Sequence, residues 1–326
     1  MKPVVFSGIK PSGNLHIGNY LGALRRWVAS QDERENIFCI VDLHAVTVPQ
    51  DPATLRRQIR ELAALYIACG LDPKRTTIFV QSHVPAHAEL AWLFNCVTPM
   101  GWMRRMTQFK EKSAERKEEV SVGLFAYPAL MAADILLYQA NLVPVGDDQR
   151  QHVELTRDIA IRFNTLFGEV FTIPEAEVGQ VGARIMSLAD PTKKMAKSAT
   201  DAGSIDLLDS PDVIRQKLAR AKTDALRDIL FDPERAGVNN LLVIYQLFSE
   251  QSREQIETHF AGQGYAALKR EIGNVIIEGL RPIQERCREL LADEDELSSI
   301  LRAGAERVTP TANKTLAEAK AAMGLG

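Results

Sequence analysis

The first two-thirds of the chain alternate short runs of β-prone residues with segments whose hydrophobic residues recur at helical spacing. The β-prone runs are residues 3–6, 37–41 and 76–80. Between them, hydrophobic residues recur every three or four positions over 17–28 and 55–66, which is the periodicity of a helix with one buried face. This strand–helix–strand–helix–strand order predicts a parallel, doubly wound α/β sheet.

Further along the chain the pattern changes from mixed to helical. Residues 104–119 are densely charged, which is typical of a solvated helix face. Residues 184–188 form the last β-prone run, and after about residue 200 the hydrophobic residues follow helical spacing. The other predicted elements are a helix over 130–138, a strand over 142–145, and helices over 212–221, 240–248, 265–291 and 294–323.

This change in pattern predicts two domains. The first is an α/β domain over 1–203, built on a doubly wound, parallel, Rossmann-like sheet, with a helical insertion at about 82–130. The second is an all-helical domain over 204–326. A length of 326 residues agrees with two domains of roughly 150 residues each.

Composition and charge exclude several classes of protein. Lys and Arg number 39 and Asp and Glu 42, a formal net charge of −3. This excludes a polybasic, histone-like binder but is compatible with a local basic face that contacts phosphates. Cys39, Cys69, Cys96 and Cys287 form no CxxC pair, so we expect reduced thiols in a cytoplasmic protein, without a structural zinc site or redox motif. We expect no membrane span, because no apolar run approaches about 18 residues.

Two familiar motifs are incomplete. Residues 8–13 have the outer glycine spacing of a P-loop, but Asn14 stands where the phosphate-binding lysine belongs. His83 and His87 are separated by Pro85, which argues against one helical metal-binding face. We therefore predict a loop at 83–87 rather than a zinc site.

Four other segments offer functional chemistry, and all are predicted at the carboxyl ends of strands, where a doubly wound sheet binds its ligands. In 6–19, glycines allow close approach of the backbone, and His16 and Asn19 can donate to phosphate or nucleotide groups. A tight turn with a solvent-facing histidine is an equal alternative. In 191–198, three lysines and two hydroxyl residues suit a polyphosphate, although composition alone favours a charged surface loop.

The remaining two segments offer carboxylates. Asp134 lies inside an apolar stretch, where an ionised carboxylate is costly unless it is paired. It therefore suits a hydrogen-bond donor on an apolar ligand, and an aspartate at the boundary of the core is the alternative. Asp147 and Asp148 follow Gly146 and suit ribose hydroxyls and ammonium groups, unless one of them is a helix N-cap.

Together these segments resemble a known family. A HIGH-like element after the first strand and a KMSKS-like element after the last resemble the class I aminoacyl-tRNA synthetases. Dense motifs from residue 4 to about 222 are similar to those of bacterial tryptophanyl-tRNA synthetases, and weaker ones continue to the C-terminus. The motifs are Phe6-Ser-Gly-Ile, Pro11-Ser-Gly13, His16-Ile-Gly18-Asn19, Val41-Asp-Leu-His44-Ala, Arg105-Met-Thr-Gln-Phe-Lys110, Met131-Ala-Ala-Asp134-Ile-Leu-Leu-Tyr138, Val145-Gly-Asp-Asp-Gln149, Gly182-Ala-Arg-Ile-Met186 and Lys193-Lys-Met195.

The resemblance implies a tryptophan–tRNA ligase. Such an enzyme uses ATP to convert L-tryptophan to tryptophanyl-adenylate and then transfers the tryptophanyl group to the 3′ end of tRNA(Trp). The resemblance also implies magnesium bound with ATP, a symmetric homodimer, a cytoplasmic location and an anticodon-binding role for the helical domain. An iron–sulfur site, present in some relatives, is not expected because Cys287 stands alone in that domain.

The resemblance also assigns roles to individual residues. Lys194, Lys197 and His16 would be catalytic, the two lysines by neutralising charge on the leaving pyrophosphate. The tryptophan pocket would consist of Phe6, His44, Met131, Asp134 and Gln149, with Asp134 accepting the indole N–H. ATP would be bound by Lys10, Pro11, Ser12, Gly18, Asn19, Gly146, Asp147, Asp148, Ile185, Lys194, Met195, Ala196, Lys197 and Ser198.

Two alternatives remain open at this point. In tyrosyl-tRNA synthetases the position matching Phe6 is usually a tyrosine and that matching Met131 a glutamine, so the apolar pair favours tryptophan. A non-catalytic or repurposed paralogue that binds tryptophan or a nucleotide is suggested only by Ala196, where the family pattern has serine. Lys10 stands where many members have glutamine, and we hypothesise that this cation partly offsets the lost hydroxyl and lowers the need for magnesium.

Overall fold

The computed structural model describes residues 2–106, 120–146, 149–177, 184–196, 203–226 and 228–326. In this part of the chain, five parallel strands form one sheet in the order β3-β2-β1-β4-β5. This order confirms the predicted doubly wound sheet, because the chain winds outward in both directions from β1. The strands are β1 (Val4–Ile9), β2 (Glu35–Ile40), β3 (Thr77–Val80), β4 (Leu142–Pro144) and β5 (Glu175–Glu177).

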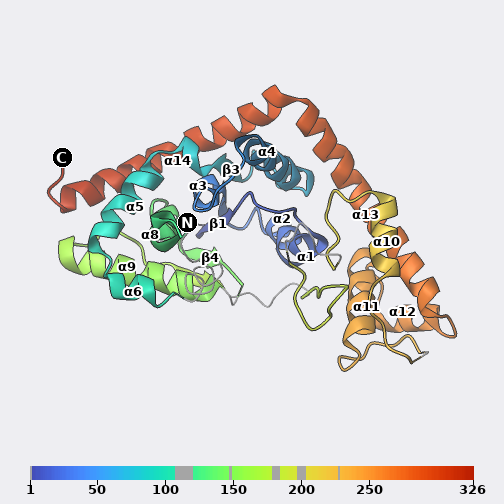
Figure 1. The fold of residues 1–326 in the computed structure, drawn as a ribbon. Helices are drawn as coiled ribbons and strands as arrows, with labels where there is room; N and C mark the ends of the chain where they lie inside the picture. Colours follow the sequence, from blue (N-terminus) through green and yellow to red (C-terminus); the bar gives the residue numbers. More distant parts are fainter. Residues whose placement is uncertain (1, 107–119, 147–148, 178–183, 197–202, 227) are drawn as a thin grey trace.

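Helices cover both faces of the sheet, and further helices follow it along the chain (Figure 1). Those between the strands are α1 (Ile17–Asn19), a π-helical turn (Tyr20–Leu24), α2 (Arg25–Ala29), α3 (Asp42–Ala45), α4 (Pro52–Ala68), a 3-10 turn (Gln81–His83), α5 (Ala86–Val97), α6 (Met100–Arg104), α8 (Val122–Leu136) and α9 (Arg150–Phe167). Those after the sheet are α10 (Pro211–Ala219), α11 (Ala236–Ser249), α12 (Arg253–Phe260), α13 (Tyr265–Ala292) and α14 (Glu294–Ala322).

Local sequence explains where several helices begin. Asp51 precedes Pro52 at the start of α4, and its carboxylate accepts a hydrogen bond from the backbone N–H of Thr54. Ser210 precedes Pro211 at the start of α10 in the same way. A polar N-cap satisfies a backbone donor that has no partner within the helix, and proline at the first helical position loses no hydrogen bond there.

The sheet separates two hydrophobic clusters, and β2 supplies residues to both. Phe38 and Ile40 belong to the cluster shared with α4 and α13. Ile37 and Cys39 belong to the cluster shared with α5, α8 and α9. Side chains alternate between the faces of a strand, so a central parallel strand with helices on both faces is hydrophobic throughout.

The last two helices join the C-terminal region to the sheet. Helix α13 packs against α4, and α14 packs along the edge strand β3; Figure 1 shows them as a long bent arm above the sheet. At the closest approach, a Cβ added to Gly304 of α14 would lie 1.9 Å from the carbonyl oxygen of Ile78 in β3. Only glycine permits this contact between the helix and the strand.

Two predicted elements were wrong, and one strand was missed. Residues 184–188 do not form a strand of the sheet: Met186 makes only an isolated antiparallel bridge with Lys194. The fifth strand is Glu175–Glu177, whose two glutamates hide the β pattern. The segment 83–87, predicted as a loop, contains the end of the 3-10 turn and the start of α5.

The other helix predictions agree with the structure to within a few residues, except that α8 begins eight residues before the predicted helix over 130–138; no range was predicted for α9 or α12. Most of the charged segment 104–119 lies outside the described residues.

Candidate active site

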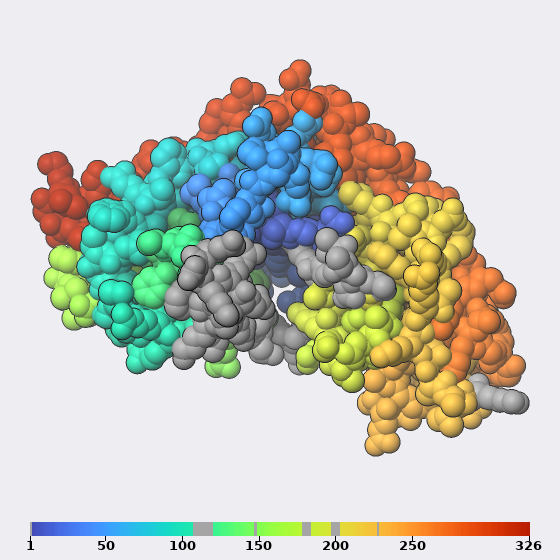
Figure 2. All heavy atoms as spheres, viewed as in Figure 1, coloured from blue at the N-terminus to red at the C-terminus, as the bar shows by residue number. Residues whose placement is uncertain are grey.

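A cavity of about 470 Å³ opens at the carboxyl ends of β1 and β4. The chain leaves these two neighbouring strands toward opposite sides of the sheet. Doubly wound sheets bind their ligands at such a point. Figure 2 shows the molecule hollowed near its centre, with the deep-blue N-terminal residues at the bottom of the hollow. The predicted site residues that line this cavity are Phe6, Lys10, Asn19, His44, Met131, Asp134, Gly146 and Gln149.

Asp134 is the buried polar centre of this cavity. It lies in α8 with 1% of its surface exposed. Oδ2 accepts a hydrogen bond from His44 Nε2 at 2.7 Å, and Oδ1 accepts from Gln81 Nε2 at 2.5 Å and from His87 Nδ1 at 2.6 Å. These donors come from the segments that follow β2 and β3, so the sheet brings three distant parts of the chain to one carboxylate.

These donors keep the carboxyl group ionised. Burial alone would raise the pKa of Asp134, but the charge and hydrogen bonds of His44 and His87 outweigh it and lower the pKa to about 2. A carboxylate has about four lone-pair sites, and donors among the described residues occupy three of them. One site on Oδ2 remains for a donor from a ligand in the cavity.

The donor behind Asp134 is itself oriented by a tyrosine. His87 Nε2 lies 2.7 Å from the hydroxyl of Tyr138, and burial raises the pKa of Tyr138, which therefore stays protonated. His87 Nδ1 lies 2.6 Å from Oδ1 of Asp134, so both imidazole nitrogens have a hydrogen-bond partner. The chain Tyr138–His87–Asp134 thus fixes the orientation of the imidazole ring.

Apolar side chains surround the carboxylate. Phe6 in β1 stacks on Tyr138, with ring centroids 5.8 Å apart and planes at 14°. Met131 lies one turn before Asp134 in α8 and lines the cavity. Tyr127 also lines it, and burial raises its pKa to about 12. The cavity is therefore suited to a flat, apolar ring that carries one hydrogen-bond donor.

Sequence analysis did not identify Gln81, His87, Tyr127 or Tyr138 as site residues. Gln81 was detectable in principle, because it directly follows β3 as Asp42 follows β2. The role of His87 has no comparable signal, since it depends on the angle at which α5 crosses α8. The structure separates His87 from His83, which is exposed.

The turn after β1 holds the predicted nucleotide-binding residues. His16 is buried against Gly18, where an added Cβ would lie 2.9 Å from His16 Nδ1. The side chain of Asn19 accepts a hydrogen bond from the backbone N–H of His16 at 3.1 Å. Ile17 N–H donates to the carbonyl of Ile205. The solvent-facing histidine that was the alternative at this position is excluded.

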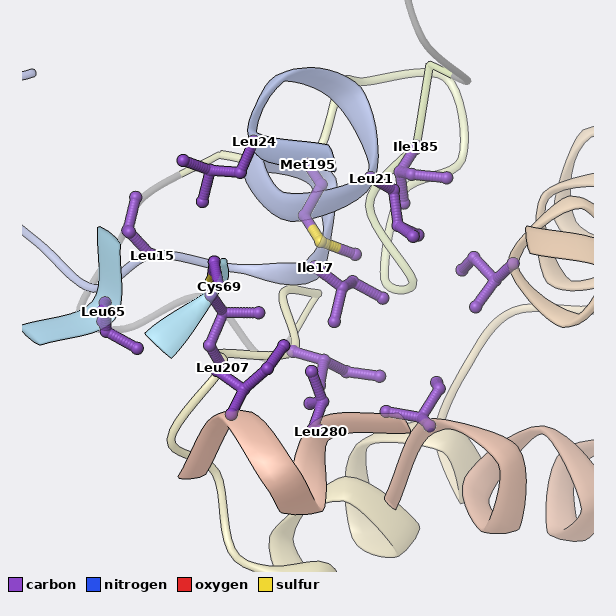
Figure 3. Close-up of a cluster of buried hydrophobic side chains, with 14 of the residues drawn as sticks. Leu15, Ile17, Leu21, Leu24, Leu65, Cys69, Ile185, Met195, Leu207 and Leu280 are labelled. Carbon is purple, nitrogen blue, oxygen red and sulfur yellow. The ribbon is translucent and has the colours of Figure 1, made fainter. Parts of the chain in front are cut away.

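The lysine-rich segment forms the second arm of a short hairpin with 184–188. Ser187 N–H donates to Lys193, and Met195 N–H donates to Ile185. Ile185 and Met195 are buried beside Leu21, as Figure 3 shows, whereas Lys194 is exposed. The buried side chains anchor the hairpin against the helix that follows β1.

Other predicted residues are not placed in the main cavity. Pro11 lines a separate cavity of about 350 Å³ between the turn and α4. Lys193, one of the three lysines, pairs with Asp190 at 3.2 Å. Ser12 lies in the turn after β1, and Ala196 is exposed at the end of the hairpin. Asp147, Asp148, Lys197 and Ser198 lie outside the described residues.

Within the described residues, no group of three or more His, Cys, Asp or Glu side chains is arranged to hold a metal ion. None of their helices is long and apolar enough to cross a membrane.

Comparisons with known proteins identify a family for the chain. The family of class I tRNA synthetases for tryptophan and tyrosine matches residues 1–281. The tryptophan–tRNA ligase of Caldanaerobacter subterraneus subsp. tengcongensis is 56% identical, covering 98% of this chain and 98% of its own length. Tryptophanyl-tRNA synthetase from Mycoplasma pneumoniae has a TM-score of 0.89 at 35% identity and covers 100% of this chain and 99% of its own. The Campylobacter jejuni enzyme, in complex with ADP and tryptophan, has a TM-score of 0.89 at 34% identity, with coverage of 99% and 100%.

Proposed function

The chain belongs to the class I tRNA synthetases for tryptophan and tyrosine, its function is that of a tryptophan–tRNA ligase, and we propose how its residues carry out that reaction. The observation that carries the proposal is the apolar cavity at the carboxyl ends of β1 and β4, with the ionised carboxylate of Asp134 in its wall. The substrates are L-tryptophan, ATP and tRNA(Trp).

Tryptophan binds in the cavity with its indole N–H on the remaining lone-pair site of Asp134 Oδ2. Phe6 and Met131 contact the faces of the ring, and His44 and Gln149 lie at the edge of the cavity. His44 already donates to the same oxygen, so it fixes the direction in which that oxygen accepts. This arrangement orients the substrate carboxylate toward the turn after β1, where ATP binds.

ATP binds over the turn after β1 and beside the lysine hairpin. The ATP-binding residues are those that the resemblance implies, with Lys194 and Lys197 acting on the leaving pyrophosphate as the substrate carboxylate attacks the α-phosphorus. Preorganised positive charge is most effective where negative charge develops in the transition state. Magnesium, when bound, neutralises phosphate charge. We propose that the phosphates provide most of its ligands, as is usual for magnesium bound with a nucleotide.

In the second step a ribose hydroxyl at the 3′ end of tRNA attacks the adenylate carbonyl. We propose that residues 1–203, with a helical insertion at about 82–130, form the catalytic domain, and that residues 204–326 bind the anticodon. With this division, helix α14 of the anticodon-binding domain packs against strand β3 of the catalytic domain. Since tRNA charging supplies translation, we propose that the protein acts in the cytoplasm.

The apolar walls favour tryptophan over tyrosine. A phenol hydroxyl can donate to Asp134 as the indole N–H does, but its oxygen finds no hydrogen-bond donor on Phe6 or Met131, which costs about 1–3 kcal/mol. Tyrosine therefore loses binding energy that the indole ring of tryptophan retains.

We propose that the protein is a homodimer through the surface behind the tryptophan cavity. A groove of about 400 Å³ runs between α3, α5 and α8. Trp92 and Val46 in this groove are 67% and 58% exposed, and large exposed aromatic side chains are typical of protein interfaces. Thr47 and Tyr127 line both the groove and the tryptophan cavity, so dimer contacts would support the substrate pocket.

The test of the function is exchange of pyrophosphate into ATP, with tryptophan and tyrosine in parallel. We expect exchange that depends on tryptophan alone, followed by charging of tRNA(Trp). Exchange with tyrosine alone would contradict the roles given to Phe6 and Met131. The absence of exchange with either amino acid, in folded protein, would favour the non-catalytic paralogue.

A further inference from the structure

Asn240 of α11 holds the outer edge of the lysine hairpin. Its Oδ1 accepts a hydrogen bond from the backbone N–H of Met186, and its Nδ2 donates to the backbone carbonyl of the same residue, both at 2.9 Å. Asn240 is 5% exposed. One side-chain amide therefore satisfies both backbone groups of Met186.

The hairpin geometry explains why Met186 needs these bonds. Ile185 and Ser187 point their backbone groups toward the lysine arm, where they pair with Met195 and Lys193. In an antiparallel pair, the residue between them points its N–H and C=O to the opposite side. Met186 is that residue, and Asn240 takes the place that a neighbouring strand would occupy.

Two further contacts link α11 to this hairpin through the segment at Lys222. The backbone N–H of Lys222 donates to the carbonyl of Leu188 at 2.9 Å. A Cβ added to Gly237, one turn before Asn240, would lie 2.4 Å from the carbonyl oxygen of Lys222. The helix, the Lys222 segment and the hairpin are thus in direct backbone contact, and at Gly237 there is no space for a side chain.

We propose that Asn240 is a positioning residue that sets the height of the lysine hairpin above the turn after β1, and so links the helical region to the chemistry on ATP. This inference rests on the proposed function, because Asn240 would act only through the lysine hairpin and would not contact a substrate. Lys194 lies directly opposite Met186 in the hairpin, so a shift of Met186 moves the ammonium group. A displacement of about 1 Å at a reacting centre costs up to about 100-fold in rate.

The test compares Asn240→Leu, Asn240→Ala and a control, Asn239→Leu, which alters the neighbouring half-buried residue of the same helix. Both Asn240 variants remove the two hydrogen bonds, whereas only Asn240→Leu keeps the number and branching of the side-chain heavy atoms. We expect both to lower the kcat of tryptophan-dependent pyrophosphate exchange by about 10- to 100-fold. The affinity for tryptophan should stay within about twofold, because the tryptophan cavity has no lining residue from the hairpin or α11. The control should resemble the parent.

Each other outcome overturns the inference. Parental kcat in both variants would show that the hydrogen bonds to Met186 do not position the hairpin. Loss only in Asn240→Ala would assign the effect to packing volume. Parallel loss of tryptophan affinity, or failure of both variants to fold, would assign Asn240 to general stability. The parent protein's own exchange activity tests the proposed function separately, so the two failures are distinguishable.

Discussion

Replacing Asp134 by asparagine tests the central feature of the tryptophan cavity. The substitution keeps the size of the side chain but turns one acceptor oxygen into an amide donor. His44, Gln81 and His87 donate to both oxygens of this side chain. In the variant, the new NH2 group therefore points at one or more of these donors and cannot accept their hydrogen bonds. The indole N–H loses its charged acceptor in the same step.

The expected magnitude follows from the type of hydrogen bond. A bond to an ionised group contributes about 1.5–3 kcal/mol, and about 1.4 kcal/mol corresponds to a factor of ten. Tryptophan should therefore bind about 10- to 150-fold more weakly to Asp134→Asn. The measurement is equilibrium dialysis with labelled tryptophan, with circular dichroism to show that the variant is folded.

A substrate analogue identifies which interaction is lost. The benzothiophene analogue of tryptophan has sulfur in place of the indole N–H, and so cannot donate to Asp134. The parent should bind tryptophan much more tightly than the analogue, and Asp134→Asn should bind the two almost equally. An unchanged ratio in the variant would refute the assignment of the indole N–H to Asp134.

The same carboxylate has a consequence for acid stability. Burial alone would raise the pKa of Asp134, but His44 and His87 lower it from 3.8 to about 2. The folded state thus holds the proton less tightly than the unfolded state. This group contributes about 2–3 kcal/mol above pH 4, and the contribution disappears as the pH falls toward 2. Asp134→Asn should unfold in urea with a weaker pH dependence between pH 4 and 2.

Three other substitutions test separate parts of the structure. Gly304→Ala should lower the unfolding temperature, because the added Cβ would lie 1.9 Å from the carbonyl oxygen of Ile78 and overpacking costs about 1–3 kcal/mol or more. The control is Gly101→Ala, which has open space around it. Equal melting curves for the two variants would contradict this packing. Trp92→Glu should yield a monomer in light scattering and a higher KM for tryptophan; an unchanged mass would move the interface elsewhere. Lys10→Gln should raise the magnesium concentration needed for adenylate formation, and an unchanged requirement would remove Lys10 from that role.

The parts of the fold that sequence analysis predicted are those with a strong local pattern. Residues 37–41 and 76–80 are rich in β-prone residues, and they correspond to β2 inside the sheet and β3 at its edge. The β5 strand was missed because Glu175–Glu177 pairs only with β4 at the other edge. Residues 184–188 have the same β-prone composition as a sheet strand, but their partners are the lysine arm and a side-chain amide.

The candidate site shows a similar division. The sequence by itself determined that Asp134 lies in an apolar helix, that Phe6 and Met131 offer no hydroxyl partner, and that glycines open the turn after β1. It also determined the family, because motifs of this kind depend on residue type and spacing. These properties are local, and each can be read within one or two turns of chain.

Only the tertiary structure decided what meets Asp134. His87 and His44 stand 47 and 90 positions from it in the chain, and Gln81 stands 53 positions away. They converge because parallel strands end at one edge of the sheet, so segments that follow different strands become neighbours. Asn240 and Met186 are 54 positions apart and meet because α11 packs beneath the hairpin. Local patterns carry no information on such crossings, since they arise from the packing of whole elements.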